Sequence, residues 1–220
     1  MLPAGEQTTE CNDIIADVCF VVDDSGSIRD NDPRNWGRLK SFMKLIVHRF
    51  IIGLTRTRVG IVLFSNDAFP YMKLNETSDE LTLLRRIHEL PYRGGNTNTS
   101  GGLYVMKHVI FQPWSGDRPD VTNIAIVITD GESTKDKHLT EPYAKEARDS
   151  GVKILTVGVT DLINLTELKK IASQPQSRTI LRVGDYAKLI TALDSLVGEA
   201  CVKGTTFVCT FGHAQVHAQS

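Results

Sequence analysis

Three short polar segments carry the residue types that could bind a metal ion. Asp23 follows an apolar run and begins an Asp-x-Ser-x-Ser segment that also contains Ser25 and Ser27. Asp130 follows a second apolar run, and Thr97 lies between the two in the loop sequence GGNTNT. Hydroxyl and carboxylate oxygens are hard ligands, which suit Mg²⁺, Mn²⁺ or Ca²⁺ better than Zn²⁺ or Cu²⁺. Two carboxylates roughly neutralise such an ion, and hydroxyls donate weakly, so the ion would still accept an oxygen from outside.

Apolar runs alternating with amphipathic segments supply the elements that must position these loops. Continuous apolar runs predict buried strands over 17–22, 59–64, 123–129, 152–159 and 178–183. The segment 68–74 contains Pro70, which favours an edge strand. Apolar residues at helical spacing predict a helix over 34–52, closed by Gly53, and another over 101–111. A third helix should follow a capping box of Thr77 and Glu80, and a fourth should cover 140–150, with Gly151 as its C-cap. Two more are expected, one opened by Asn164 and Glu167 and one from Asp185 to about 200.

This order of elements predicts an α/β fold with a doubly wound, mainly parallel sheet, helices on both faces and one antiparallel edge strand. We expect a single domain over 16–202, flanked by tails at 1–15 and 203–220. Ligands of open α/β sheets bind beyond the carboxyl ends of the strands. The three polar loops should therefore meet at one edge of the sheet.

These residues resemble a known family. The Asp23-x-Ser25-x-Ser27 segment, the Thr97 loop and the Thr-Asp130-Gly-Glu segment look like the metal-ion-dependent adhesion site of von Willebrand factor type A domains. That family includes the inserted domains of integrins and the A domains of matrilins and collagen VI. The resemblance covers about 17–201. It implies a Rossmann-like fold in which Ser25, Ser27 and Thr97 coordinate the metal through hydroxyls, while Asp23 and Asp130 act mostly through water.

The resemblance also implies a function. A Glu or Asp side chain of a partner protein would complete the coordination of Mg²⁺, Mn²⁺ or Ca²⁺. The expected role is a non-enzymatic, extracellular adhesion module that binds a matrix or cell-surface protein, possibly a collagen. Asp24 stands where the family often has a small or neutral residue. We expect it to add negative charge beside the site and to weaken the attraction for an acidic partner.

The cysteines and sequons fit a secreted protein. In many secreted relatives the two ends of the domain are bridged, which implies a disulfide between Cys11 and Cys201. Cys19 lies inside a buried strand, so we expect a core residue, and Cys209 is left for a possible interchain disulfide.

Three Asn-x-Ser/Thr sequons lie at Asn75, Asn98 and Asn164. Asn98 adjoins Thr97 inside the proposed metal rim, where a glycan would crowd a docking protein. We therefore expect glycans at Asn75 or Asn164, with little at Asn98.

Composition excludes several classes of protein. With 25 Lys and Arg against 26 Asp and Glu, the net charge of −1 argues against nucleic-acid binding. The sequence contains no run of 18 consecutive apolar residues, so no membrane span is predicted. The first residues, MLPAGEQTTE, lack the apolar core of a signal peptide. The extracellular expectation therefore depends on the resemblance, the cysteines and the sequons.

Two alternatives remain at this point. A Mg²⁺-dependent phosphatase of the haloacid-dehalogenase type also places Asp at the end of its first strand, but it needs a second Asp where this chain has Ser25. An intracellular type A domain of a protein-assembly factor would share the metal motif, although the terminal cysteines and the sequons argue against it.

Overall fold

The computed structural model describes residues 14–30, 32–160 and 163–192, together with residues 196, 198 and 200. The tail segments 1–13 and 203–220 lie outside these residues, as do Cys11, Cys201 and Cys209 with their expected disulfides. None of the described helices is long and apolar enough to cross a membrane.

A six-stranded sheet with the order β3-β2-β1-β4-β5-β6 forms the centre of the domain. β1, β2, β4, β5 and β6 pair in parallel, and only β3, at the edge, runs antiparallel to its neighbour β2. The expected fold class is therefore confirmed. The strands are β1 Ala16–Asp23, β2 Arg58–Phe64, β3 Ala68–Met72, β4 Thr122–Thr129, β5 Lys153–Val159 and β6 Ile180–Val183.

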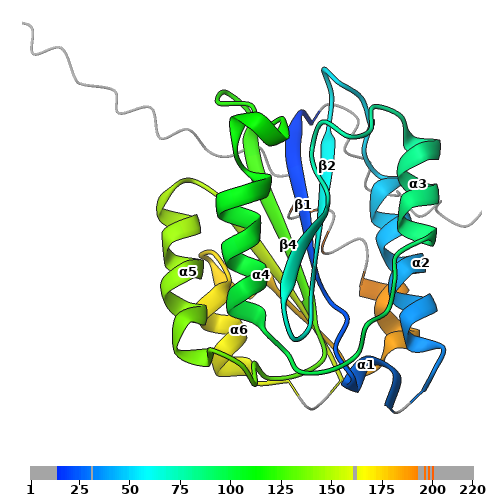
Figure 1. The fold of residues 1–220 in the computed structure, drawn as a ribbon, viewed down its shortest axis with the longest axis vertical. Helices are drawn as coiled ribbons and strands as arrows, with labels where there is room; N and C mark the ends of the chain where they lie inside the picture. Colours follow the sequence, from blue (N-terminus) through cyan, green and yellow to red (C-terminus); the bar gives the residue numbers. More distant parts are fainter. Residues whose placement is uncertain are drawn as a thin grey trace, which may run out of the picture.

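Helices cover both faces of the sheet. Figure 1 shows α2 and α3 on one side and α4, α5 and α6 on the other, with the short α1 near one end of the strands. The helices are α1 Ser27–Asp30, α2 Asn35–Val47, α3 Glu80–His88, α4 Thr99–Val105, the π-helix η1 Met106–Ile110, the 3-10 helix η2 Pro113–Ser115, α5 Lys137–Asp149, α6 Leu165–Ile171, α7 Gln176–Thr179 and the 3-10 helix η3 Tyr186–Ala192.

The alternation of side chains along β1 divides the core in two. Val18, Phe20 and Val22 face the α2 side, where they join one apolar cluster. Cys19 and Val21 face the α4 side and belong to a second cluster. Cys19 is fully buried with a free thiol, which confirms it as a core residue. Because both faces of β1 are buried, its residues 18–22 are continuously apolar rather than alternating.

Several expected boundaries were wrong. The helix expected over 34–52 ends at Val47, because Phe50 enters the core through tight turns and Ile52 instead bridges to Thr57. The expected strand over 178–183 begins only at Ile180, because a short helix occupies the residues before it.

The capping residue of α3 also differs from the expectation. Asp79, rather than Thr77, caps this helix, and its carboxylate accepts a hydrogen bond from the N–H of Thr82 at 2.8 Å. A carboxylate at a helix N-terminus also complements the helix dipole, which favours Asp79 over the Thr77 hydroxyl.

Two other expected caps are confirmed. The side chain of Asn164 accepts hydrogen bonds from two N–H groups of α6. Asp185 accepts from the N–H of Lys188 at 3.0 Å, at the start of η3. Of the apolar residues expected on the final helix, Leu189 and Leu196 are buried, whereas the side chains of 190, 193 and 197 lie outside the described set.

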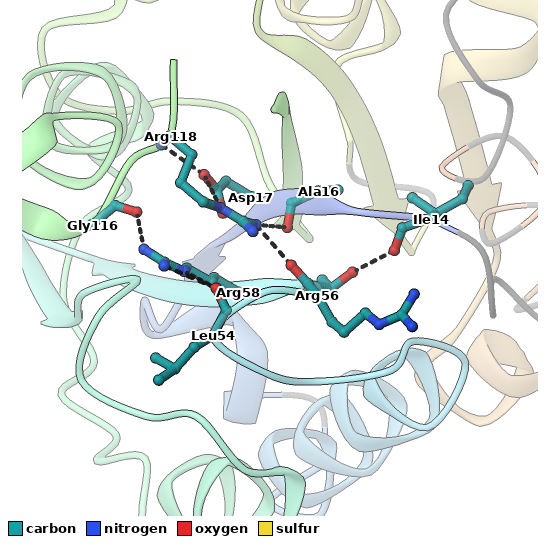
Figure 2. Close-up of polar contacts among 9 residues, drawn as sticks. Ile14, Ala16, Asp17, Leu54, Arg56, Arg58, Gly116 and Arg118 are labelled. Atoms are coloured by element: carbon teal, nitrogen blue, oxygen red, sulfur yellow. Dashed lines mark hydrogen bonds and ion pairs between the residues drawn. The ribbon is translucent and has the colours of Figure 1, made fainter. Parts of the chain in front are cut away.

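A buried ion pair ties the amino-terminal edge of the sheet together, at the opposite end of the strands from the polar loops. Asp17 is fully buried, and its carboxylate accepts hydrogen bonds from the guanidinium of Arg118 at 2.6 and 3.0 Å. Figure 2 shows that the same guanidinium also reaches the carbonyl oxygens of Ala16 and Arg56. These contacts join β1 to the loop before β2 and to the loop before β4, so they tie β1 to the segments that lead into its two neighbouring strands.

Candidate metal site

The loop after β1 holds Asp23 in a fixed orientation. Its carboxylate is fully buried, and one oxygen accepts a hydrogen bond from the N–H of Ser25 at 2.9 Å. The other oxygen accepts from the Thr129 hydroxyl, at the end of β4, at 2.7 Å. Asp23 is thus bonded to the neighbouring strand and to its own loop, which leaves it little freedom to move.

Hydroxyls connect this loop to the second carboxylate. The Ser25 and Ser27 side-chain oxygens lie 3.1 Å apart, and the Ser27 hydroxyl donates to Asp130 at 2.6 Å. A bond this short is typical of a hydroxyl donating to a charged carboxylate. The predicted residues of the loops after β1 and β4 therefore lie together, although more than a hundred residues separate them in the sequence.

The loop containing Thr97 closes the third side of the site. Gly94 and Gly95 have φ values of +71° and +93°, which favour glycine, and the turn they make brings this loop against the β1 loop. The N–H of Gly26 donates to the carbonyl of Gly95, and the N–H of Gly94 donates to that of Asp24, both at 3.0 Å.

Thr97 itself is held by its backbone. Its N–H donates to the Thr134 hydroxyl at 2.9 Å, and its carbonyl accepts from the N–H of Thr134 at 2.9 Å. Since Thr134 follows β4, these contacts bind the Thr97 loop to the loop that carries Asp130. All three predicted segments therefore meet at the carboxyl edge of the sheet.

Asp24 does not add the free negative charge that the sequence suggested. Its buried carboxylate makes a bidentate pair with the guanidinium of Arg93, with both contacts at 2.7 Å. Arg93 in turn stacks over the Phe69 ring, 4.5 Å from its centroid. The expectation was wrong because an arginine nearly seventy residues away neutralises this carboxylate.

The protein interior disfavours the two site carboxylates in their charged forms. Burial, together with the charge of Asp130, raises the pKa of Asp23 to about 7 despite its hydrogen bonds. Burial likewise raises the pKa of Asp130. Raised values follow when carboxylates are desolvated near each other without a compensating cation. A divalent cation would supply that compensation.

Two further residues, which the sequence analysis did not identify, border the site. The Tyr186 hydroxyl on η3 is buried and interacts with the carboxylate of Asp130. It lies near enough to Asp130 and Asp23 that burial and their charges raise its pKa. Thr160, at the end of β5, has a φ of +77° and donates from its hydroxyl to the carbonyl of Asp130 at 3.1 Å.

The donors present fit a hard divalent cation. The hydroxyls of Ser25 and Ser27 lie beside Asp130, and the Thr97 loop packs against the β1 loop that carries them. Among the described residues, neither Asp23 nor Asp130 forms an ion pair. In the described part of the chain, no group of three His, Cys, Asp or Glu residues forms a softer or more acidic metal site.

The three sequons occupy different environments. The Asn98 side chain is buried, caps α4 by accepting from the N–H of Gly101, and donates from its amide to the carbonyl of Asn66. The Asn75 side chain is exposed. Asn164 is half-buried and uses its side-chain oxygen, rather than its amide nitrogen, to cap α6.

Comparison with known proteins agrees with this geometry. The von Willebrand factor type A domain profile matches residues 17–195. The collagen alpha-1(XX) chain of Mus musculus is 32% identical over 188 residues, which are 86% of this chain and 14% of that collagen. The transmembrane cell adhesion receptor mua-3 of Caenorhabditis elegans is 32% identical over 212 residues, which are 93% of this chain and 5% of the receptor. The chain spans a fifth or less of the length of these relatives.

A solved structure gives a further comparison. Proximal thread matrix protein 1 from the mussel byssus superposes with a TM-score of 0.82 at 27% identity, over 87% of this chain and 49% of the other. A second structure of that protein, described as having a zinc-occupied MIDAS motif, superposes with a TM-score of 0.81 at 29% identity, over 88% and 47%. The ligand chemistry that favours Mg²⁺ therefore does not exclude zinc from a site of this kind.

Proposed function

Because this chain belongs to the von Willebrand factor type A domain family, we propose that it is an extracellular adhesion module that binds an acidic side chain of a matrix protein through Mg²⁺. One observation carries the proposal: Ser25, Ser27 and Asp130 meet at the carboxyl edge of the sheet. The Ser25 and Ser27 hydroxyl oxygens lie 3.1 Å apart, and the Ser27 hydroxyl donates to Asp130 at 2.6 Å. Its relatives include collagen chains and a cell adhesion receptor, which supports an extracellular matrix setting.

The chain's own residues would divide the work at the ion. The hydroxyls of Ser25, Ser27 and Thr97 would contact it, and the carboxylates of Asp23 and Asp130 would balance its charge through water. The ion supplies an electrophilic centre that accepts an oxygen from a partner carboxylate. Because hydroxyl ligands donate little electron density to the ion, it would remain a strong acceptor for that oxygen. The Asp24–Arg93 pair neutralises a nearby negative charge that would otherwise repel the partner carboxylate.

The site supports binding better than phosphoryl transfer. Asp23, the residue that a haloacid-dehalogenase phosphatase would use as nucleophile, is fully buried, and each of its carboxylate oxygens already accepts a hydrogen bond. A nucleophile must reach its substrate in line. Such a phosphatase also needs a lysine downstream of the nucleophile. Lys135, in the loop after β4, bonds to the carbonyl of Asn66 and the carboxylate of Asp67. We therefore propose a non-enzymatic role.

The test measures binding of the domain to native collagen fibres, the candidate partner, in Mg²⁺, Mn²⁺, Zn²⁺ or EDTA. We expect binding in Mg²⁺ and its loss in EDTA. Ser27→Ala, which removes a metal-contacting hydroxyl, should abolish binding, whereas Ser78→Ala, at an exposed loop serine, should leave it unchanged. Equal binding in Mg²⁺ and EDTA would refute the proposed mechanism.

A second measurement separates the ion from the partner. An ion that binds only the folded state stabilises it by mass action, by about 2.7 kcal/mol at a hundredfold excess over its dissociation constant. Titration of the metal-free domain with Mg²⁺ should therefore raise its melting temperature. A shift without collagen binding would retain the metal site and reject collagen as the partner.

A further inference from the structure

A groove along α2, bounded at one side by Tyr186 and Ala187 of η3, gathers basic side chains. It has a volume of about 670 Å³ and is lined by Arg34, Arg38, Lys40 and Lys44 together with His88 from the end of α3. No carboxylate is among the described residues that line it. Since the whole chain has a formal charge of −1, this is a local segregation of positive charge.

Small residues form the floor of this basic groove. Gly37 and Ser41 lie one helical turn apart on the exposed face of α2, and the Ser41 hydroxyl donates back to the Gly37 carbonyl at 3.1 Å. A Cβ added at Gly37 would meet nothing within 4 Å. The longer basic side chains therefore flank a hollow that is open to an incoming ligand.

The charges around the groove are only partly compensated. The carboxylate of Asp32 pairs with two of the lining residues, Arg34 at 2.9 Å and Arg38 at 2.8 Å. Lys40 donates to the carbonyl of His88 at 2.8 Å, which neutralises no charge. Partial burial and the charge of Lys44 lower the pKa of Lys40. An anion in the groove would relieve this repulsion between neighbouring ammonium groups.

We propose that the basic groove binds an extended sulfated polysaccharide. Arg34 and Lys44 are ten residues apart along one helix, or about 15 Å, so the positive charges form a row and do not converge on one point. A row of side chains matches repeated sulfate groups along a chain, whereas a single small anion needs donors that converge on one point. Guanidinium and ammonium groups both bind such oxyanions strongly.

Other polyanions fit the groove less well. Single-stranded nucleic acid requires aromatic rings on which bases stack, and the one aromatic residue of the lining, Tyr186, is only 3% exposed. An acidic protein partner would need a large apolar anchor at the centre of its interface. Apart from Tyr186, the described lining offers only Ala187 as an apolar side chain.

Heparin, a highly sulfated polysaccharide, serves as the probe. The domain is passed over immobilised heparin in EDTA, so that the outcome is independent of the metal site. We expect wild-type binding that weakens steeply with NaCl, because each contact releases bound counterions. Lys40→Gln with Lys44→Gln should weaken binding by about tenfold at about 0.15 M NaCl. The charge-matched control, Lys145→Gln with Lys169→Gln, changes exposed lysines of α5 and α6 and should have no effect.

A second pair of variants tests the groove without removing any basic side chain. Gly37→Glu puts a carboxylate on the open floor and should also weaken binding by about tenfold, while Gly37→Ala should bind as wild type. Both replace an exposed helical glycine, so neither should impair folding. Absence of heparin binding would overturn the proposal, as would equal losses in the two lysine pairs. Equal affinity for unsulfated hyaluronan, or tighter binding of single-stranded DNA or a poly-glutamate peptide at matched salt, would also overturn it.

Discussion

The raised pKa of Asp23 makes a quantitative prediction about the metal-free domain. The pKa of this carboxyl is raised from its ordinary value of 3.8 to about 7, first by burial and then by the charge of Asp130. A folded-state pKa above the unfolded-state value means that the folded protein holds the proton more tightly. The contribution to stability is therefore fully present below about pH 4 and is lost as the pH rises through about 7.

The magnitude follows from the size of the shift. About three pH units at 1.36 kcal/mol per unit correspond to about 4 kcal/mol of lost stability above pH 7. Asp23→Asn removes the ionisation and should recover most of this in EDTA. The amide can still accept from the N–H of Ser25. Thr129, whose hydroxyl lies 3.2 Å from the Gly131 carbonyl, can turn to donate there instead. We expect a net gain of about 2–4 kcal/mol, since the charge-assisted part of two hydrogen bonds is lost.

The neighbouring residue supplies a matched control with the opposite sign. Asp24→Asn makes the same chemical change at an equally buried position, but there the carboxylate is paired with Arg93. Breaking that pair should cost about 2 kcal/mol, because Arg93 is partly exposed and regains some hydration.

The assay is urea unfolding from pH 4.5 to 8.5, in EDTA and in saturating Mg²⁺. In EDTA, the difference between Asp23→Asn and wild type should be small at the acid end and should grow towards pH 8. In Mg²⁺ the order should reverse, since only the wild type keeps the charge that balances the ion. A variant less stable than wild type in EDTA at pH 8, or a difference that does not change with pH, would refute the assignment of Asp23.

Three further outcomes are expected. Arg118→Met should lower the free energy of unfolding by about 3–5 kcal/mol, measured in urea, because it leaves the buried carboxylate of Asp17 without its partner. An undiminished midpoint would show that the pair adds nothing. Glycopeptide mapping of secreted protein should find little glycan at Asn98, whose amide is buried and bonded; full occupancy there would contradict this. Digestion without reductant should release Cys11 and Cys201 in one disulfide-linked peptide, and thiol labelling of both would exclude the bridge.

The order of elements could be predicted because burial on both faces leaves a simple trace in the sequence. The central strands are mostly apolar, β1 ends at Asp23, and Asp130 directly follows β4. In a parallel sheet such ends share one edge, so the meeting of the loops follows from topology. The boundaries were less predictable, because Phe50 remains in the core beyond the last helical turn of α2. Periodicity does not distinguish a helix from a tight turn that buries the same side chain.

The pairing of distant charges could not be predicted. Asp24 looked like an unfavourable charge because only its sequence neighbours were visible, and its partner Arg93 comes from a loop nearly seventy residues later. The same holds for Asp17 and Arg118, about a hundred residues apart. An ion pair needs only two side chains at one place in space, and it leaves no regular spacing in the sequence. Such pairs have to be read from the structure.

Three residues that break local rules lie together at the carboxyl edge of the sheet, and they support the site independently of any motif. Asp23 and Asp130 are buried carboxylates with raised pKa values, and Thr160 is a β-branched residue at a φ of +77°. Each of these features costs free energy in the isolated domain. The three come from the ends of β1, β4 and β5, so no local defect in one segment explains them together. Proteins tolerate such departures chiefly where function requires them. A bound cation beside these oxygens would offset the charge term directly, which is why the metal assignment and the stability of Asp23 variants must be tested together.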